Sequence, residues 1–85
     1  MPIYMVERTF AEAFDPDGET MEESSKYLDE KEIRWITSFL SADKKRSYCL
    51  YEADDASALI EAAEALGLPC DSIVEVTDLM QDVAR

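Results

Sequence analysis

Carboxylate side chains are the groups in this chain best suited to chemistry. One set lies in the string DPDGE, where Asp15, Asp17 and Glu19 occupy alternate positions. Carboxylate oxygens suit hard divalent cations such as Mg²⁺, Ca²⁺ and Mn²⁺, so these three residues are the candidate metal ligands. Pro16 and Gly18 depart from the residue order of an EF-hand calcium loop. We expect a solvated turn that leads into an acidic helix start, with cation binding as the alternative.

A second set of carboxylates lies in segments rich in β-branched and aromatic residues. Glu7, Glu52 and Glu75 could serve as acid and base, as paired carboxylates do in isomerases and hydrolases, or they could line a binding cavity. Alternatively, they could form plain ion pairs with Arg8 and Arg34. Together with neighbouring aromatic and hydroxyl groups, the candidate ligand-binding residues are Glu7, Trp35, Thr37, Tyr51, Glu52 and Glu75.

Composition limits the other kinds of catalysis. The chain has no histidine, which removes Ser-His-Asp and Cys-His mechanisms and histidine-ligated metals. Cys49 and Cys70 stand in neither a Cys-x-x-Cys nor a zinc-ribbon spacing, so we expect two free and mostly buried thiols. Cys49 lies among bulky neighbours, where packing is favoured over nucleophilic work. No motif identifies a reaction, and the catalytic residues stay unknown.

Hydrophobic periodicity predicts the strands that would position these residues. Residues 3–10 alternate, with Ile3, Met5, Glu7 and Thr9 on one face and Tyr4, Val6, Arg8 and Phe10 on the other. Residues 33–41 and 46–53 predict two more strands, and the short polar link 42–45 favours an antiparallel hairpin. Residues 72–77 alternate as a fourth strand.

Two further segments have helical spacing. Small or apolar side chains fall at the i, i+3, i+4 and i+7 positions at Met21, Ser24, Ser25 and Leu28, and again at Ala56, Leu59, Ile60 and Ala63. A turn at 15–18 precedes the first helix. Asp54 or Asp55 can cap the second helix, and Gly67 followed by Pro69 ends it.

The order of elements is therefore βαββαβ. With right-handed crossovers it predicts an α+β fold of the ferredoxin-like type, in which a four-stranded antiparallel sheet carries both helices on one face. A chain of 85 residues has material for one core. We expect a single domain over residues 1–78 and a C-terminal tail over residues 79–85.

The charge of the chain excludes several kinds of partner. Lys plus Arg total 8 against 20 for Asp plus Glu, a net charge of −12, which repels nucleic acids and anionic membranes. An RNA-recognition domain shares the predicted element order, but residues 46–53 lack the basic, glycine-containing strand of that domain. No apolar stretch could span a bilayer, and the N-terminus lacks the layout of a secretory signal, so we expect a cytoplasmic protein.

The predicted sheet carries bulky apolar side chains on both faces. In residues 33–41, Ile33, Trp35 and Phe39 stand in one register and Ile36 and Leu40 in the other. Strands that are apolar on both faces are covered on both faces. Because both helices cover one face, we expect a second copy of the sheet on the other, in a homodimer. The binding cavity would then lie between the two sheets.

Four strings along the chain are similar to one known family. They are VERTF (6–10), SFLSAD (38–43) after Trp35, YCLYEAD (48–54) and GLPCDSIVEV (67–76). On these strings the chain resembles the family called domain of unknown function 4242, over about residues 1–78. The resemblance implies a ferredoxin-like, dimeric α/β-barrel architecture and, for some members, nickel binding. Nickel usually takes imidazole and oxygen donors, whereas this chain offers carboxylates, which favour Mg²⁺, Ca²⁺ or Mn²⁺.

The leading hypothesis is a small homodimeric binding protein whose inter-sheet cavity takes a small molecule or a weakly held divalent cation. The alternative is a cofactor-free enzyme of the dimeric α/β-barrel monooxygenase or isomerase type, which would use the strand carboxylates. A third hypothesis is a regulatory protein whose acidic surface docks on a basic partner.

Overall fold

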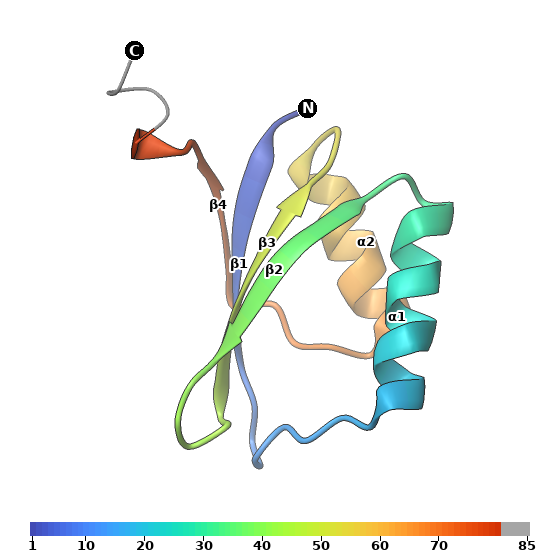
Figure 1. Cartoon of the computed structure of the whole chain (residues 1–85), viewed down its shortest axis with the longest axis vertical. Coiled ribbons are helices and arrows are strands. Elements are labelled where there is room, and N and C mark those ends of the chain that lie inside the picture. Colours follow the sequence, from blue (N-terminus) through green and yellow to red (C-terminus); the bar gives the residue numbers. More distant parts are fainter. Residues whose placement is uncertain (81–85) are drawn as a thin grey trace.

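The computed structural model describes residues 1–80. Its elements, in chain order, are β1 (Ile3–Thr9), α1 (Gly18–Glu30), β2 (Arg34–Leu40), β3 (Arg46–Glu52), α2 (Ala56–Leu66) and β4 (Ser72–Val76). The strands form one antiparallel sheet in the order β2-β3-β1-β4, and both helices lie on the same face of it (Figure 1). The predicted ferredoxin-like fold is confirmed. Each strand ends one residue earlier than predicted.

The helices begin and end where local chemistry dictates. The Asp17 side chain accepts a hydrogen bond from the backbone N–H of Thr20 at 2.7 Å and caps α1. Asp55 caps α2 in the same way through the N–H of Ala58 at 3.1 Å. At the other end of α2, Gly67 takes the left-handed conformation with φ of 69°, which a residue without Cβ adopts at little cost. Within residues 1–80, no helix has both the length and the apolar character needed to cross a membrane.

The helix-covered face of the sheet, called here the helix face, carries the core. Strand alternation directs Tyr4, Val6 and Arg8 of β1 to this face, and all three are buried. Their register partners on β3 are Tyr51, Cys49 and Ser47, which are buried as well. Leucines and alanines of the two helices complete the core at Leu28, Leu59, Ala62 and Ala63.

The opposite side, called here the open face, has no helix over it (Figure 1). Cross-strand pairing places one set of apolar side chains on it: Ile3, Met5, Phe39, Tyr48, Leu50, Val74 and Val76. Phe39 and Val74 are 59% and 53% exposed. The charged residues of the same registers are Glu7, Arg34, Arg46 and Glu52.

A β-bulge in β2 corrects one prediction. Trp35 pairs with Tyr51 and Thr37 with Leu50, so one extra residue stands between them. An extra residue reverses the alternation of every side chain that follows. Trp35 therefore faces the helices while Phe39 lies on the open face, although simple alternation predicted that they share a face.

Both cysteines are free thiols, as predicted. Cys49 is buried within the sheet, as expected, whereas Cys70 is exposed, because it lies in the loop between α2 and β4 rather than in an element that packs on the core. Residues 81–85 of the predicted C-terminal tail lie outside the described residues.

Candidate functional site

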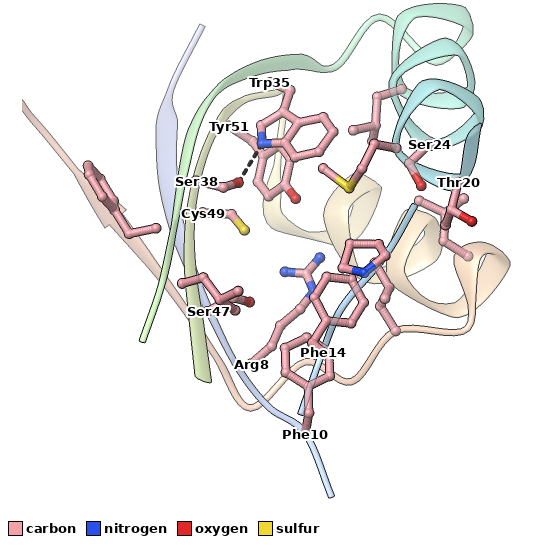
Figure 2. A pocket seen from close by; sticks show the side chains of 17 residues that line it. Arg8, Phe10, Phe14, Thr20, Ser24, Trp35, Ser38, Ser47, Cys49 and Tyr51 are labelled. Carbon is pink, nitrogen blue, oxygen red and sulfur yellow. Dashed lines mark hydrogen bonds between the residues drawn. The ribbon is translucent and has the colours of Figure 1, made fainter. Parts of the chain in front are cut away.

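A cavity of about 210 Å³ lies between the helix face of the sheet, α1 and the segment that joins β1 to α1 (Figure 2). Its walls are mainly apolar and aromatic, with Phe10, Phe14, Met21, Leu28, Trp35, Leu66 and Leu68 among the lining residues. The polar lining residues include Arg8, Thr20, Ser24, Ser38, Ser47 and Tyr51. Small-molecule sites commonly combine apolar walls with a few polar groups in this way.

Arg8 is the charged group of this cavity. It is 5% exposed, and its guanidinium projects from β1 into the cavity (Figure 2). Its Nε and Nη1 atoms are buried and have no hydrogen-bond partner among residues 1–80. Of the described residues, none that lines the cavity is a carboxylate. A guanidinium stays charged at every accessible pH, so this buried cation cannot escape its desolvation by losing a proton.

Tyr51 stands beside Arg8 on the neighbouring strand. The guanidinium carbon of Arg8 lies 5.9 Å from the centroid of the Tyr51 ring, which is within cation–π range. Burial raises the pKa of Tyr51 well above its usual value, and the nearby Cys49 thiol raises it further. The positive charge of Arg8 partly offsets this rise in the pKa. The Tyr51 phenol is therefore a neutral hydroxyl at physiological pH.

Aromatic pairs build two walls of the cavity. Phe10 and Phe14 stack with their ring centroids 4.4 Å apart and their planes 7° from parallel. Trp35 packs against Tyr51 at a centroid separation of 6.1 Å. The indole N–H of Trp35 donates a hydrogen bond to Ser38 Oγ at 2.6 Å, which holds the ring across the top of the cavity in Figure 2.

The sheet divides the predicted ligand-binding residues. Trp35 and Tyr51 line the cavity, whereas Glu7, Thr37 and Glu52 lie on the open face. Two pairs of oppositely charged side chains occur on that face. Glu7 Oε1 lies 3.5 Å from Arg46 Nη1, and Glu52 Oε1 lies 3.5 Å from Arg34 Nη1.

The two arginines predicted to pair with the strand carboxylates, and Glu75 itself, have different surroundings. Arg34 neutralises a strand carboxylate, as one prediction had it, whereas Arg8 faces the cavity and meets no lining carboxylate. Glu75 pairs in register with Tyr4 on the helix side of β4, and its side chain is exposed. Its negative charge contributes to raising the pKa of Tyr4, although burial contributes more.

The predicted metal ligands near the start of α1 serve other purposes. Asp17 is a helix cap, and its hydrogen bond from the Thr20 N–H lowers the pKa of its carboxyl. Asp15 Oδ1 lies 3.7 Å from Lys44 Nζ, and Glu19 is exposed in the first turn of α1. Among residues 1–80, no three His, Cys, Asp or Glu side chains gather closely enough to hold a metal ion. In the described residues these three carboxylates cap a helix, lie near a lysine and are exposed at a helix start, respectively.

Sequence reasoning missed Arg8, Phe10, Phe14 and Ser38 as members of one site. Arg8 had a signal, because it alternates in phase with Tyr4 and Val6 and so belongs to the apolar face. A charged residue in phase with a core face is unusual and points to a partner or a ligand. Phe10 had the same signal, because alternation over residues 3–10 places it in phase with Arg8, whereas Phe14 lies in an irregular segment where periodicity carries no information.

The fold and the cavity define a small ferredoxin-like α+β protein with a pocket between its sheet and its first helix. More specifically, the chain belongs to the family described as nickel responsive protein SCO4226-like, whose model matches residues 4–76. The resemblance to domain of unknown function 4242 is thus supported as far as a small nickel-related family, under a different name. No curated protein matches the chain.

A solved structure supports the same fold. The crystal structure of SCO4226 from Streptomyces coelicolor A3(2) matches with a TM-score of 0.74 over 89% of this chain and 96% of that chain. The two sequences are 18% identical, so this likeness establishes the architecture alone.

Proposed function

We propose that this protein is a homodimeric binding protein for a small molecule, which it holds in the cavity between its sheet and α1. The observation that carries the proposal is the pairing of an apolar cavity with the unpartnered donors of Arg8. A cavity that had evolved only as a packing defect would gain nothing from a buried cation, because an unpaired buried charge is strongly destabilising. The predicted cavity between two sheets is replaced in this proposal by one on the helix face.

Binding is favoured over the enzymatic alternative. That alternative relied on strand carboxylates, and Glu7 and Glu52 are neutralised by arginines on the open face, across the sheet from the cavity. The described lining offers no carboxylate or histidine as a general base. The Tyr51 phenol, with its raised pKa, is poorly suited to that role as well.

Nickel does not fit the donor set of a single protomer. The chain has no histidine, and residues 1–80 gather no group of three potential ligands. Nickel sites in proteins favour imidazole nitrogen. We therefore assign the cavity to an organic molecule and treat a divalent cation as a competing ligand in the binding experiment.

The homodimer is proposed from the open face. Its seven apolar side chains lie next to one another across the strands and form an apolar patch. Extended apolar patches on a protein surface mark interaction sites. Its charges cancel in the two pairs Glu7–Arg46 and Arg34–Glu52, whereas the chain as a whole carries −12. This neutral face is where two acidic protomers can meet without strong repulsion, so we commit to a second copy as its occupant.

A thermal-shift screen tests the binding proposal. Purified protein is heated with apolar anions, neutral molecules and amines at millimolar concentration, and with NiCl₂ as a separate arm. Ligand binding raises the unfolding temperature by mass action. We expect at least one organic class to raise it and to change the fluorescence of Trp35, the single tryptophan, which lines the cavity. A response to NiCl₂ alone, or to nothing, would refute the proposal.

Sedimentation velocity tests the homodimer. At micromolar concentration we expect a dimer for the unmodified chain and a monomer for Val74→Lys, which places a charge on the open face at a residue that does not line the cavity. Ile60→Lys is the matched control, because Ile60 is an exposed apolar residue on α2, away from that face. A monomeric unmodified chain, or equal effects of the two substitutions, would contradict the assignment.

A further inference from the structure

We infer that the ligand of this cavity is an organic monocarboxylate with a compact apolar body, preferably an aromatic ring, whose carboxylate binds Arg8. The inference rests on the proposed function, since it names the ligand class of the same cavity. It follows from three properties of the site: its single buried cation, its size and the chemistry of its walls.

The charge of the ligand follows from Arg8. The residue is 5% exposed. Its Nε and Nη1 atoms carry more than half of the guanidinium N–H donors and have no hydrogen-bond partner in the described part of the chain. Neighbouring Tyr51 contributes only the face of its ring and a neutral hydroxyl. An anion supplies both the missing hydrogen-bond acceptors and the missing countercharge, and hydrogen bonds between two charged groups are the strong ones.

A single negative charge matches this site better than two. Arg8 is the one cationic side chain among the described residues that line the cavity. A dianion such as phosphate would leave charge and acceptors unsatisfied against apolar walls, at a high desolvation cost. The chain's net charge of −12 also opposes multiply charged anions. A carboxylate, which is a planar monoanion, suits a guanidinium geometrically.

The body of the ligand follows from the volume and the walls. An engineered apolar cavity of about 150 Å³ holds benzene, so a cavity of about 210 Å³ has room for a ring with a short acidic side chain. The stacked pair Phe10–Phe14 and the pair Trp35–Tyr51 present aromatic surfaces to it. Aromatic rings favour offset-stacked and edge-to-face contacts with such walls.

The experiment is a titration monitored by Trp35 fluorescence and by calorimetry. Phenylacetate is the probe, phenylacetamide is its neutral isostere, phenethylamine is the cationic counterpart, and inorganic phosphate tests a bare anion site. For the unmodified chain we expect phenylacetate to bind about tenfold or more tighter than the amide, as charged hydrogen bonds imply, and the amine and phosphate to bind least.

Two variants, each of which removes one cation, test whether the preference depends on Arg8. Arg8→Met should remove the preference for the carboxylate over the amide while keeping the apolar walls. It should also raise the unfolding temperature of the free protein, because an apolar residue replaces an unpaired buried charge. Lys26→Met, at an exposed cation of α1 that does not line the cavity, should leave the preference unchanged.

The titrations distinguish the ligand class, the role of Arg8 and the proposed function. Equal affinity for phenylacetate and phenylacetamide in the unmodified chain, or phosphate binding as tight as phenylacetate, would overturn the ligand class while leaving a binding cavity. A carboxylate preference that survives Arg8→Met would overturn the role of Arg8. Failure of all four probes, together with a failed thermal-shift screen, would remove the proposed function itself. The comparison of probes on the unmodified chain holds even where a variant fails to fold.

Discussion

The guanidinium of Arg8 and the ring of Tyr51 face each other across neighbouring strands, 5.9 Å from carbon to ring centroid. Both side chains lie on the helix face and are nearly inaccessible to water. The contact keeps a cation and a phenol together at the centre of the cavity. Burial in this environment raises the pKa of Tyr51 and so makes the stability of the chain depend on pH.

Tyr51→Phe should lessen the loss of stability in alkali. The pKa of Tyr51 is raised in the folded chain, mainly by burial, whereas an unfolded tyrosine titrates near pH 10. The stability that this group contributes is therefore fully present below about pH 10 and is lost as the pH rises further, by up to about 1.4 kcal/mol per pH unit. Urea unfolding at several pH values checks this. Tyr27→Phe, on α1 and outside the cavity lining, is the matched control substitution.

Ser38→Ala should destabilise the chain by about 1 kcal/mol, because it removes the acceptor of the 2.6 Å hydrogen bond from the Trp35 indole. The Trp35 fluorescence emission should also shift, because the indole N–H then forms its hydrogen bond with water. Urea unfolding and emission spectra measure both effects. Ser25→Ala, on the exposed side of α1, is the matched control. Identical losses for the two serines would argue against a structural role for the hydrogen bond.

The two glycines should respond to alanine with opposite signs. Gly67 has φ of 69°, so Gly67→Ala should cost about 1–2 kcal/mol through backbone strain alone, since the space around it is open. Gly18 begins α1 in open space and has no positive φ, so Gly18→Ala should stabilise by about 0.4–1 kcal/mol. Thermal unfolding distinguishes them. A shift of the same sign for both would contradict the assigned end of α2.

Leu28→Ala should destabilise the chain and also shift the preference of the cavity toward a longer ligand. Leu28 is 4% exposed and lines the cavity, so its truncation should cost about 2–5 kcal/mol and enlarge the cavity. A longer acid such as 3-phenylpropionate should then gain affinity relative to phenylacetate. Leu59→Ala is the control, because Leu59 is equally buried on α2 but is not among the lining residues. It should lose similar stability with no change in the affinity ratio, which calorimetry measures.

Much of the fold was predictable because its signals are local. Alternation in residues 3–10 placed Tyr4, Val6 and Arg8 on one face, and the structure buries all three. The second helix was expected to begin after Asp54 or Asp55 and to end at Gly67. The structure selects Asp55 as the cap, through one hydrogen bond, and Gly67 ends the helix through its left-handed backbone conformation. Rules of chain connection then leave few ways to join these elements.

The site was less predictable because its members meet only in the folded chain. Trp35 and Tyr51 were expected at a ligand site and line the cavity, whereas Glu7 and Glu52 were expected with them and lie across the sheet. The bulge in β2 decides which side of the sheet the residues after Trp35 occupy. No local sequence pattern predicts the extra residue of this β-bulge.

By itself, the sequence determined the alternation, the caps and the absence of histidine, because each depends on residue types and on neighbours a few positions apart. Only the tertiary structure decided that α1 stands off the sheet far enough to leave a cavity, and that the Arg8 guanidinium projects into it with no carboxylate among the described lining residues. The physical reason is that a cavity and a missing ion-pair partner are properties of packing between distant segments, and no local pattern encodes that packing.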